Sequence, residues 1–191
     1  PMHIKVMAEG FPWLEVNVAK VTPNAPADIK VPEGLKARAE RVKMEEAAKG
    51  VWFVGGGSHN SVAIDQGDHI TVIEGPGGDE RSAAVIAAVK KTIPGKPIRF
   101  IVNSHHHFDH SGGLRGFVAE GATVVTHKIN VPFYQQAWRS RHTIDPDMMA
   151  KSGKKATFVG IGDKHVLGAN DSALELHLLQ GSQHNAGLII G

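Results

Sequence analysis

Apolar residues between positions 51 and 75 fall into short runs that are broken by turn residues. The segments 51–56 (VWFVGG), 61–65 (SVAID) and 69–75 (HITVIEG) each have the length of a strand, and glycine, asparagine and aspartate separate them. Short runs bounded by such residues are typical of strands joined by tight turns. The pattern therefore predicts an antiparallel meander over this part of the chain.

The pattern changes after residue 78. Residues 79–95 (DERSAAVIAAVKKTIPG) have an acidic first turn, apolar residues at helical spacing, a basic last turn and a terminating Pro-Gly pair, which together predict a helix. The next segments predict a buried strand at 98–102, a short helix at 112–121, a strand at 122–126, a helix at 130–140, and strands at 156–161, 164–168, 173–180 and 188–191. Strands that come first and then alternate with helices favour an α/β or α+β layered domain.

The first 50 residues have a different character. Residues 1–32 show little periodicity, and the proline-rich stretch 21–34 (VTPNAPADIKVPEG) is typical of a loop. A helix is predicted from about Glu33 to Lys49, with Gly50 at its stop position. We interpret residues 1–50 as an N-terminal extension of loop plus helix, ahead of a domain at 51–191. The extension is either a dimer arm, which implies a homodimer, or the tail of a preceding domain.

Composition narrows the function classes. The 191 residues are 41% hydrophobic and 21% charged with a net charge of +2, and the basic residues are scattered, so neither a nucleic acid nor a membrane is an expected partner. No cysteine is present, which excludes disulfides, thiolate metal ligands and a cysteine nucleophile. No apolar run approaches the roughly 20 residues that span a bilayer, and no signal peptide is visible. Because the chain opens on Pro1 and ends inside an apolar pattern, we expect it to be a piece of a longer protein.

Histidine carries the candidate chemistry. Five of the twelve histidines lie in two glycine-flanked segments: His105, His106, His107, His110 and His184. Residues two apart in an extended segment point the same way, about 6 to 7 Å apart, so His105 and His107 can converge on one ion. After a bend, Asp109 and His110 can meet a second ion, at the roughly 3.5 to 4 Å usual for two-metal sites. The loop follows the strand 98–102, and open α/β sheets place their sites at such strand ends.

The spacing His-x-His-x-Asp-His resembles the hallmark of the metallo-β-lactamase superfamily. Segments 51–65, 69–76 and 178–190 also resemble its opening strands and its next motif, a lone histidine between glycines after a strand. The resemblance implies an αββα four-layer sandwich, two sheets face to face with helices outside, incomplete at the C-terminus. The family's further carboxylate and its last histidine would follow Gly191, beyond the end of this sequence.

The resemblance also implies the ligands and the metal. His105, His107 and His184 would hold the first metal, and Asp109 and His110 the second. Zn²⁺ is the expected cofactor, in one or two copies, with iron or manganese as alternatives.

Three imidazoles around zinc leave a coordination position open, as in catalytic sites. The ion would lower the pKa of its bound water from 15.7 towards about 7, and the resulting hydroxide would attack the substrate while Asp109, the expected catalytic residue, orients it and passes on its proton. We predict a zinc-dependent hydrolase that cleaves a small-molecule ester, thioester, lactone or β-lactam amide. The alternatives are an iron-dependent sulfur dioxygenase of the same fold, an inert metal-binding fragment, a structural metal site, or a polar loop whose histidines cluster by chance.

The neighbouring residues have simpler interpretations. His106 either faces away from the site or orients its neighbours, and Phe108 is expected to pack into the core. His59 and Asn60 lie in a turn that either borders the pocket or is solvated. Core packing is favoured over a pocket lining for three aromatic residues further along: Phe133, Tyr134 and Trp138.

Overall fold

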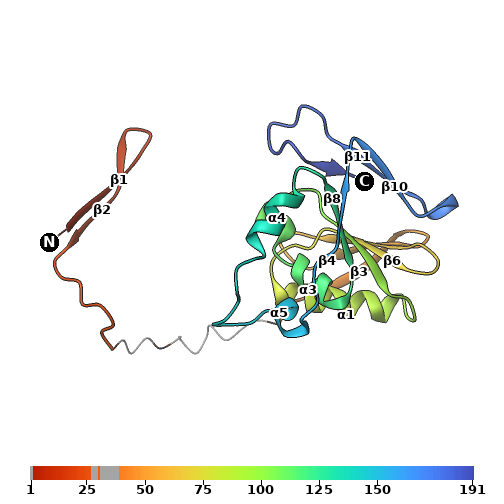
Figure 1. Cartoon of the computed structure of the whole chain (residues 1–191), viewed down its shortest axis with the longest axis horizontal. Helices are drawn as coiled ribbons and strands as arrows, with labels where there is room; N and C mark the ends of the chain where they lie inside the picture. Colours follow the sequence, from red (N-terminus) through yellow and green to blue (C-terminus); the bar gives the residue numbers. More distant parts are fainter. Residues whose placement is uncertain (1, 27–29, 31–38) are drawn as a thin grey trace. The chain divides into compact units, whose positions relative to one another are not determined.

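The structure, a computed structural model, describes residues 2–26, 30 and 39–191 (Figure 1). The chain divides into two compact units, residues 1–38 and 39–191. Each unit is described by itself. None of the described helices is both long and apolar enough to cross a membrane.

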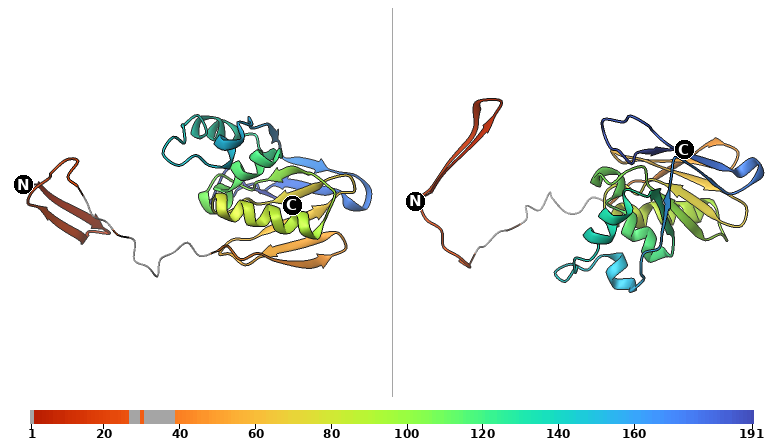
Figure 2. Two further views of the ribbon diagram at one scale, coloured as in Figure 1. Left: turned by 90° about the horizontal axis from the view of Figure 1, so that it is seen from below. Right: turned by 45° about the horizontal axis from the view of Figure 1, so that its top comes forward.

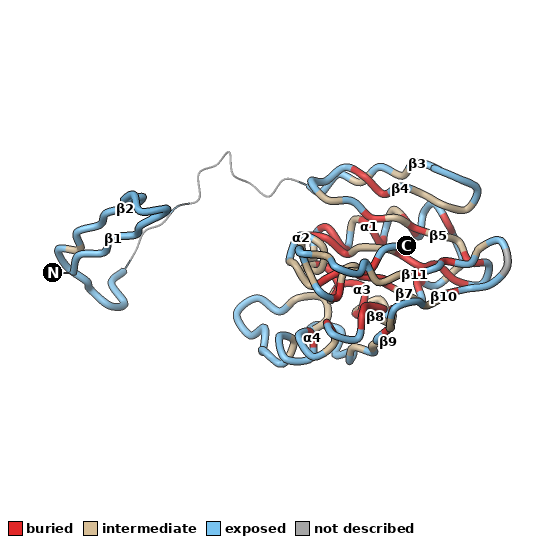
Figure 3. Tube along the Cα trace, turned by 90° about the horizontal axis from the view of Figure 1, so that it is seen from above, coloured by how far each residue is buried: buried red, intermediate tan, exposed pale blue. Residues whose placement is uncertain are grey.

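The first unit contains a β-hairpin that the sequence did not predict. Strands β1 (Met2–Ala8) and β2 (Phe11–Val18) pair antiparallel across a turn at Glu9 and Gly10, both of which have positive φ. Apolar residues lie opposite one another in the pairs Met2–Val18, Ile4–Val16 and Val6–Leu14. Directly opposed residues share a face, so the hairpin has one apolar face. Its residues are almost all exposed (Figure 3).

The helix expected from about Glu33 to Lys49 is wrong over the part that is described. Lys43–Ala48 form strand β3, which pairs antiparallel with β4 (Val51–Gly55), and Gly50 lies in the turn between them with φ of +78°. Residues 33–38 lie outside the described residues. Sheet pairing has overridden a helical propensity, which is only a weak preference. The boundary that we expected at residue 50 therefore falls inside a hairpin.

The second unit is built on a seven-stranded sheet of order β3-β4-β5-β6-β7-β8-β9. The remaining strands are β5 (Ser61–Asp65), β6 (Ile70–Ile73), β7 (Ile98–Val102), β8 (Thr123–His127) and β9 (Phe158–Ile161). The pairs from β3 to β6 are antiparallel and those from β6 to β9 are parallel. The predicted meander and the strands that follow it are thus confirmed. Parallel strands end at one edge of the sheet, where loops can carry a site.

Helices cover one face of this sheet. They are α1 (Asp79–Thr92), α3 (Leu114–Glu120), α4 (Val131–Ala137) and α5 (Met148–Ser152), whereas the short α2 (Phe108–Ser111) has no buried residue and lies in the segment between β7 and α3. Val85 and Val89 of α1 and Phe117 of α3 are buried in one cluster with Ile101 of β7 and Val124 of β8. The helical layer can be followed in the views of Figure 2.

A second sheet packs on the opposite face. It consists of β10 (Lys164–Leu167), β11 (Leu174–Leu178) and β12 (Ile189–Ile190), with a 3₁₀ helix at Asn170–Ser172. Leu176 and Ile189 of this sheet form a second buried cluster with Val102 and Val125 of the larger one. The layers are therefore helix, sheet and sheet, three layers of the predicted αββα sandwich. A helical layer outside the second sheet is not found among residues 39–191.

Candidate metal centre

The histidine loop, residues 103–113, follows β7 and is pressed against the turn that precedes α1. A Cβ atom on Gly112 would lie 1.9 Å from the carbonyl oxygen of Gly77, and one on Gly113 would lie 2.4 Å from Ser82 Oγ. No side chain fits at either position. The two glycines therefore let the loop approach this turn closely and turn into α3.

His105, His107 and His184 form the first cluster of candidate ligands. One ring nitrogen from each lies within 4.8 Å of those of the other two. The Nε2 atoms of His105 and His184 are 3.0 Å apart, and the ring centres of His107 and His184 are 4.6 Å apart. His184 comes from the loop between β11 and β12, so the fold brings together the three residues that the sequence assigned to one ion.

The environment of His105 keeps its ring neutral. The side chain is 2% exposed and its Nδ1 lies 2.9 Å from Ser104 Oγ. Burial, assisted by the neighbouring His110 and His107, lowers the pKa of His105 to about 4. A ring that is neutral at pH 7 keeps a lone pair for a metal ion. The donor set of the first cluster therefore fits a divalent metal.

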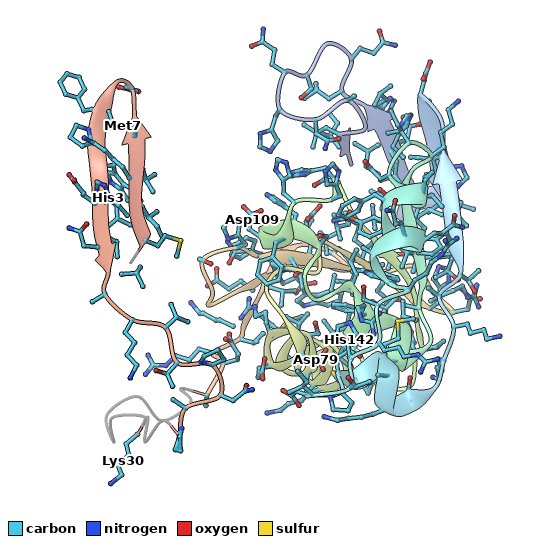
Figure 4. The ribbon with its side chains drawn as sticks, turned by 60° about the vertical axis from the view of Figure 1, so that its left-hand side comes forward. His3, Met7, Lys30, Asp79, Asp109 and His142 are labelled. Atoms are coloured by element: carbon cyan, nitrogen blue, oxygen red, sulfur yellow. The ribbon has the colours of Figure 1, made fainter. Side chains whose placement is uncertain are left out.

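Asp109 and His110 belong to a second cluster, which His59 completes. The Oδ2 atom of Asp109 lies 3.1 Å from His59 Nε2 and 3.8 Å from His110 Nε2, and one ligand atom from each of the three lies within 4.8 Å of the others. Asp109 is exposed on α2, where Figure 4 labels it. Partial loss of solvent around this carboxyl works to raise its pKa, but a backbone hydrogen bond and the neighbouring His110 and His59 outweigh that effect and hold the pKa below its usual value. The ring centres of His105 and His110 are 4.4 Å apart, so the two clusters adjoin.

Glu74 is a residue of the site that the sequence interpretation missed. It directly follows β6, with a positive φ of 66°, and its carboxylate accepts hydrogen bonds from the Ser104 backbone N–H (2.7 Å) and from His110 Nδ1 (3.0 Å). Burial raises its pKa, although these partners oppose the rise. A single carboxylate at the end of an otherwise apolar strand, followed by glycines, was the available signal.

Hydrogen bonds to α4 and to the loop that carries His184 also hold the histidine loop in place. The Tyr134 hydroxyl, which is buried, donates to Asn103 Oδ1, and Asn103 Nδ2 donates to the His110 carbonyl oxygen at 3.2 Å. His106 Nδ1 lies 3.1 Å from Asn185 Nδ2, so His106 links this loop to the loop that carries His184. Of the two interpretations of His106, the geometry favours the one in which it orients its neighbours.

The three aromatic residues of the 130–140 segment differ in exposure. Tyr134 is buried as expected, and Trp138 packs partly buried against the same core. Phe133 is 46% exposed and its ring lies 4.5 Å from that of His106, so core packing is wrong for this residue.

The expectation that Phe108 packs into the core is wrong. Its side chain is 73% exposed. Its ring covers Gly112 instead, because an added Cβ there would be 2.6 Å from the Phe108 ring. Phe108 also lines a cavity of about 320 Å³ together with His59, Asp109, Pro76 and Arg81. An open space large enough for a small molecule therefore borders the second cluster.

Comparisons with known proteins agree with this architecture. A family model described as the metallo-beta-lactamase superfamily matches residues 54–170, more than half of the chain. No curated protein matches the sequence.

Solved structures of metallo-beta-lactamases resemble the fold at low sequence identity. The enzyme from Pontibacter korlensis superposes with a TM-score of 0.59 at 16% identity, over 78% of this chain and 65% of that one. A metallo-beta-lactamase with a HARLDQ motif from Cronobacter sakazakii gives 0.57 at 20% identity, over 79% and 57%. The one from Hirschia baltica gives 0.54 at 20%, over 78% and 64%. The chain thus spans less than two thirds of the length of these three structures, and the likeness shows the fold. By its family match and its fold, the chain belongs to the metallo-β-lactamase superfamily.

Proposed function

We propose that the chain is a metal-dependent hydrolase that takes zinc at the first cluster. The observation that supports this is the convergence of His105, His107 and His184 on one point from two separate loops. Within residues 39–191 no fourth side chain joins this group as a candidate ligand. A donor set of three imidazoles with an open position is typical of catalytic rather than structural zinc.

The chain's own residues fit the reaction class. When bound, a divalent ion at this site supplies Lewis acidity, which acidifies water and neutralises charge that develops on a substrate oxygen. Asp109 keeps an ionised carboxylate at neutral pH because its pKa lies below its usual value. Asp109 lines the cavity, where its carboxylate can accept a hydrogen bond from a water molecule and then take its proton.

The substrate class follows from the size of the cavity and the type of chemistry. A cavity of about 320 Å³ is at the small end for ligand sites, which suits a small molecule. We propose an ester, thioester, lactone or β-lactam amide as the group that is cleaved. Each presents a carbonyl carbon that water can attack and a carbonyl oxygen that must carry negative charge in the transition state.

The test starts from protein stripped of metal with a chelator. Zinc is then titrated by calorimetry, and hydrolysis of a generic aryl ester and of a cephalosporin is followed. We expect tight zinc binding at the first cluster, which His184→Ala abolishes and His165→Ala leaves unchanged, since His165 lies on β10 and in neither cluster. Absence of zinc binding would overturn the proposal. Iron in the purified protein with thiol-dependent oxygen uptake would favour the dioxygenase, and zinc binding without turnover of any substrate would favour an inert metal-binding fragment.

A further inference from the structure

His59 lies on the loop between β4 and β5, far in sequence from the histidine loop that it contacts. Its Nε2 atom is 3.1 Å from Asp109 Oδ2, and its ring centre is 5.4 Å from that of His110. We propose that His59 is a protein ligand of a second divalent metal ion, held together with Asp109 and His110. This inference rests on the proposed metal-dependent function and adds to it a third side chain for the second ion.

The spacing of the three ligand atoms suits one ion. Two ligands at about 2.0 to 2.2 Å from a tetrahedral zinc ion are themselves separated by roughly 3.3 to 3.5 Å. The distances from Asp109 Oδ2 to His59 Nε2 and to His110 Nε2, 3.1 and 3.8 Å, lie on either side of that value. Small side-chain movements would therefore bring all three atoms to bonding distance.

The Nδ1 atoms of His110 and His59, which would not bind the ion, each have a hydrogen-bond partner. His110 Nδ1 is 3.0 Å from the Glu74 carboxylate, and His59 Nδ1 is 3.1 Å from Ser58 Oγ. Metal-binding histidines almost always use their second nitrogen in this way, because the outer hydrogen bond fixes the tautomer and the ring orientation. Both rings consequently direct Nε2 towards Asp109.

A plain ion pair between His59 and Asp109 is the competing interpretation. Such a pair needs a protonated His59, and both side chains are substantially exposed, at 41% and 49%, where an ion pair contributes little. It also leaves unexplained why His110 Nε2 points at the same carboxylate oxygen. A shared cation accounts for all three atoms together.

The consequence concerns the number of ions. Asp109 and His110 alone would offer a second ion two protein ligands, whereas His59 raises this to three without any residue outside the described chain. The clusters adjoin through His105 and His110. Three protein ligands on each ion would give the second site the same donor number as the first and leave open positions for solvent or substrate on both.

The experiment titrates the metal-free full chain with Co²⁺ alone, followed by visible d–d absorption and by calorimetry. We expect the wild type to bind two ions. His59→Ala should keep the first and weaken the second by at least about a hundredfold, because loss of even an outer-shell partner of a ligand costs 10- to 100-fold. Asp109→Asn should weaken the same ion, His59→Asp should recover most of its affinity, and His165→Ala should change neither. Circular dichroism confirms that each variant is folded.

The outcomes separate this inference from the proposed function. Equal affinity for the second ion in wild type and His59→Ala would overturn the role of His59, and so would a wild type that binds one ion with no effect of His59→Ala. Either result leaves the first site, and the proposed hydrolase, standing. A wild type that binds no Co²⁺ would overturn both.

Discussion

At the scale of single residues, Glu74 connects the surroundings of the two clusters. Its partly buried carboxylate accepts from the backbone N–H of Ser104, beside the first cluster, and from the ring of His110, in the second. Its backbone has positive φ, which an L-residue rarely adopts.

Glu74→Gln tests whether Glu74 positions His110 for metal binding, because the substitution leaves every candidate ligand in place. The amide can accept from one of the two N–H donors but presents its own N–H₂ group to the other. We expect the second metal ion to bind 10- to 100-fold more weakly and the first to be almost unchanged. Calorimetric titration measures both affinities, with Glu175→Gln, at an exposed position of β11, as the control. Unaltered affinity for the second ion would contradict this role.

Gly112→Ala tests the close approach of the histidine loop to the turn before α1. The added methyl group would lie 1.9 Å from the Gly77 carbonyl oxygen, so the backbone must move. Overpacking of this kind typically costs about 1 to 3 kcal/mol of unfolding free energy. Gly162→Ala is the matched control, since nothing lies within 4 Å of its added Cβ. Urea unfolding of both variants would show the difference, and equal stability would refute the argument.

At the scale of elements, Asp147 links α5 to α3 of the helical layer. This residue caps α5 by accepting from the Ala150 N–H at 2.8 Å, and it forms a two-point ion pair with Arg115 of α3. The Arg115 hydrogen bond is the main reason why the pKa of Asp147 falls to about 2. The pair is largely buried, with side-chain exposures of 12% and 15%.

The Asp147 pair predicts a pH dependence. A carboxyl whose pKa is depressed in the folded state stabilises the protein above its unfolded pKa, and this stabilisation is lost as the pH falls from about 4 to about 2. The contribution is about 2 kcal/mol, since one pKa unit corresponds to about 1.4 kcal/mol. Asp147→Asn should remove this part of the acid dependence of the unfolding free energy. The urea midpoints of wild type and variant, compared at pH 6 and near pH 2, check this; identical acid dependence would argue against it.

The elements show which parts of the fold local pattern can predict. The runs 51–56, 61–65 and 98–102 became β4, β5 and β7, because strands bounded by turn residues carry their own signal. The hairpin at residues 2–18 was missed although its strands alternate: apolar Met2, Ile4 and Val6 pair with apolar Val18, Val16 and Leu14. Lys43–Ala48 was read as helical because its pairing with β4 is tertiary information. The sequence left His59 between a pocket border and a solvated turn and gave only a weak signal for Glu74, because the order of strands in the sheet is what places them beside residues 103–113.

At the scale of the whole molecule, the expected metal joins parts that the chain supplies separately. His105 and His107 follow β7 of the large sheet, whereas His184 precedes β12 of the small one. A ligand that binds only the folded state stabilises it by about 2.7 kcal/mol at a hundredfold excess over its dissociation constant. Zinc should therefore raise the unfolding temperature of the wild type by more than that of His184→Ala, which loses a ligand of the first ion, as a thermal melt with and without zinc would show.

The unit of residues 39–191 contains every candidate ligand and both buried clusters. We expect a chain of residues 39–191 to bind the first metal ion as tightly as the full chain. Calorimetric titration of both chains tests this. Loss of binding on removal of residues 1–38 would show that the hairpin unit contributes to the site.

The short strand β12 connects the small sheet to the histidine loop. The Ile189 N–H donates to the Ser104 carbonyl oxygen at 3.1 Å, so β12 is hydrogen-bonded to the residue beside His105. A metal ion bound by His184, five residues before Ile189, would hold the same two segments together a second time. When the metal is removed, the amide hydrogens of β12 should exchange with solvent well before those of the core strands. Hydrogen exchange at this edge of the small sheet would therefore report whether the metal is bound.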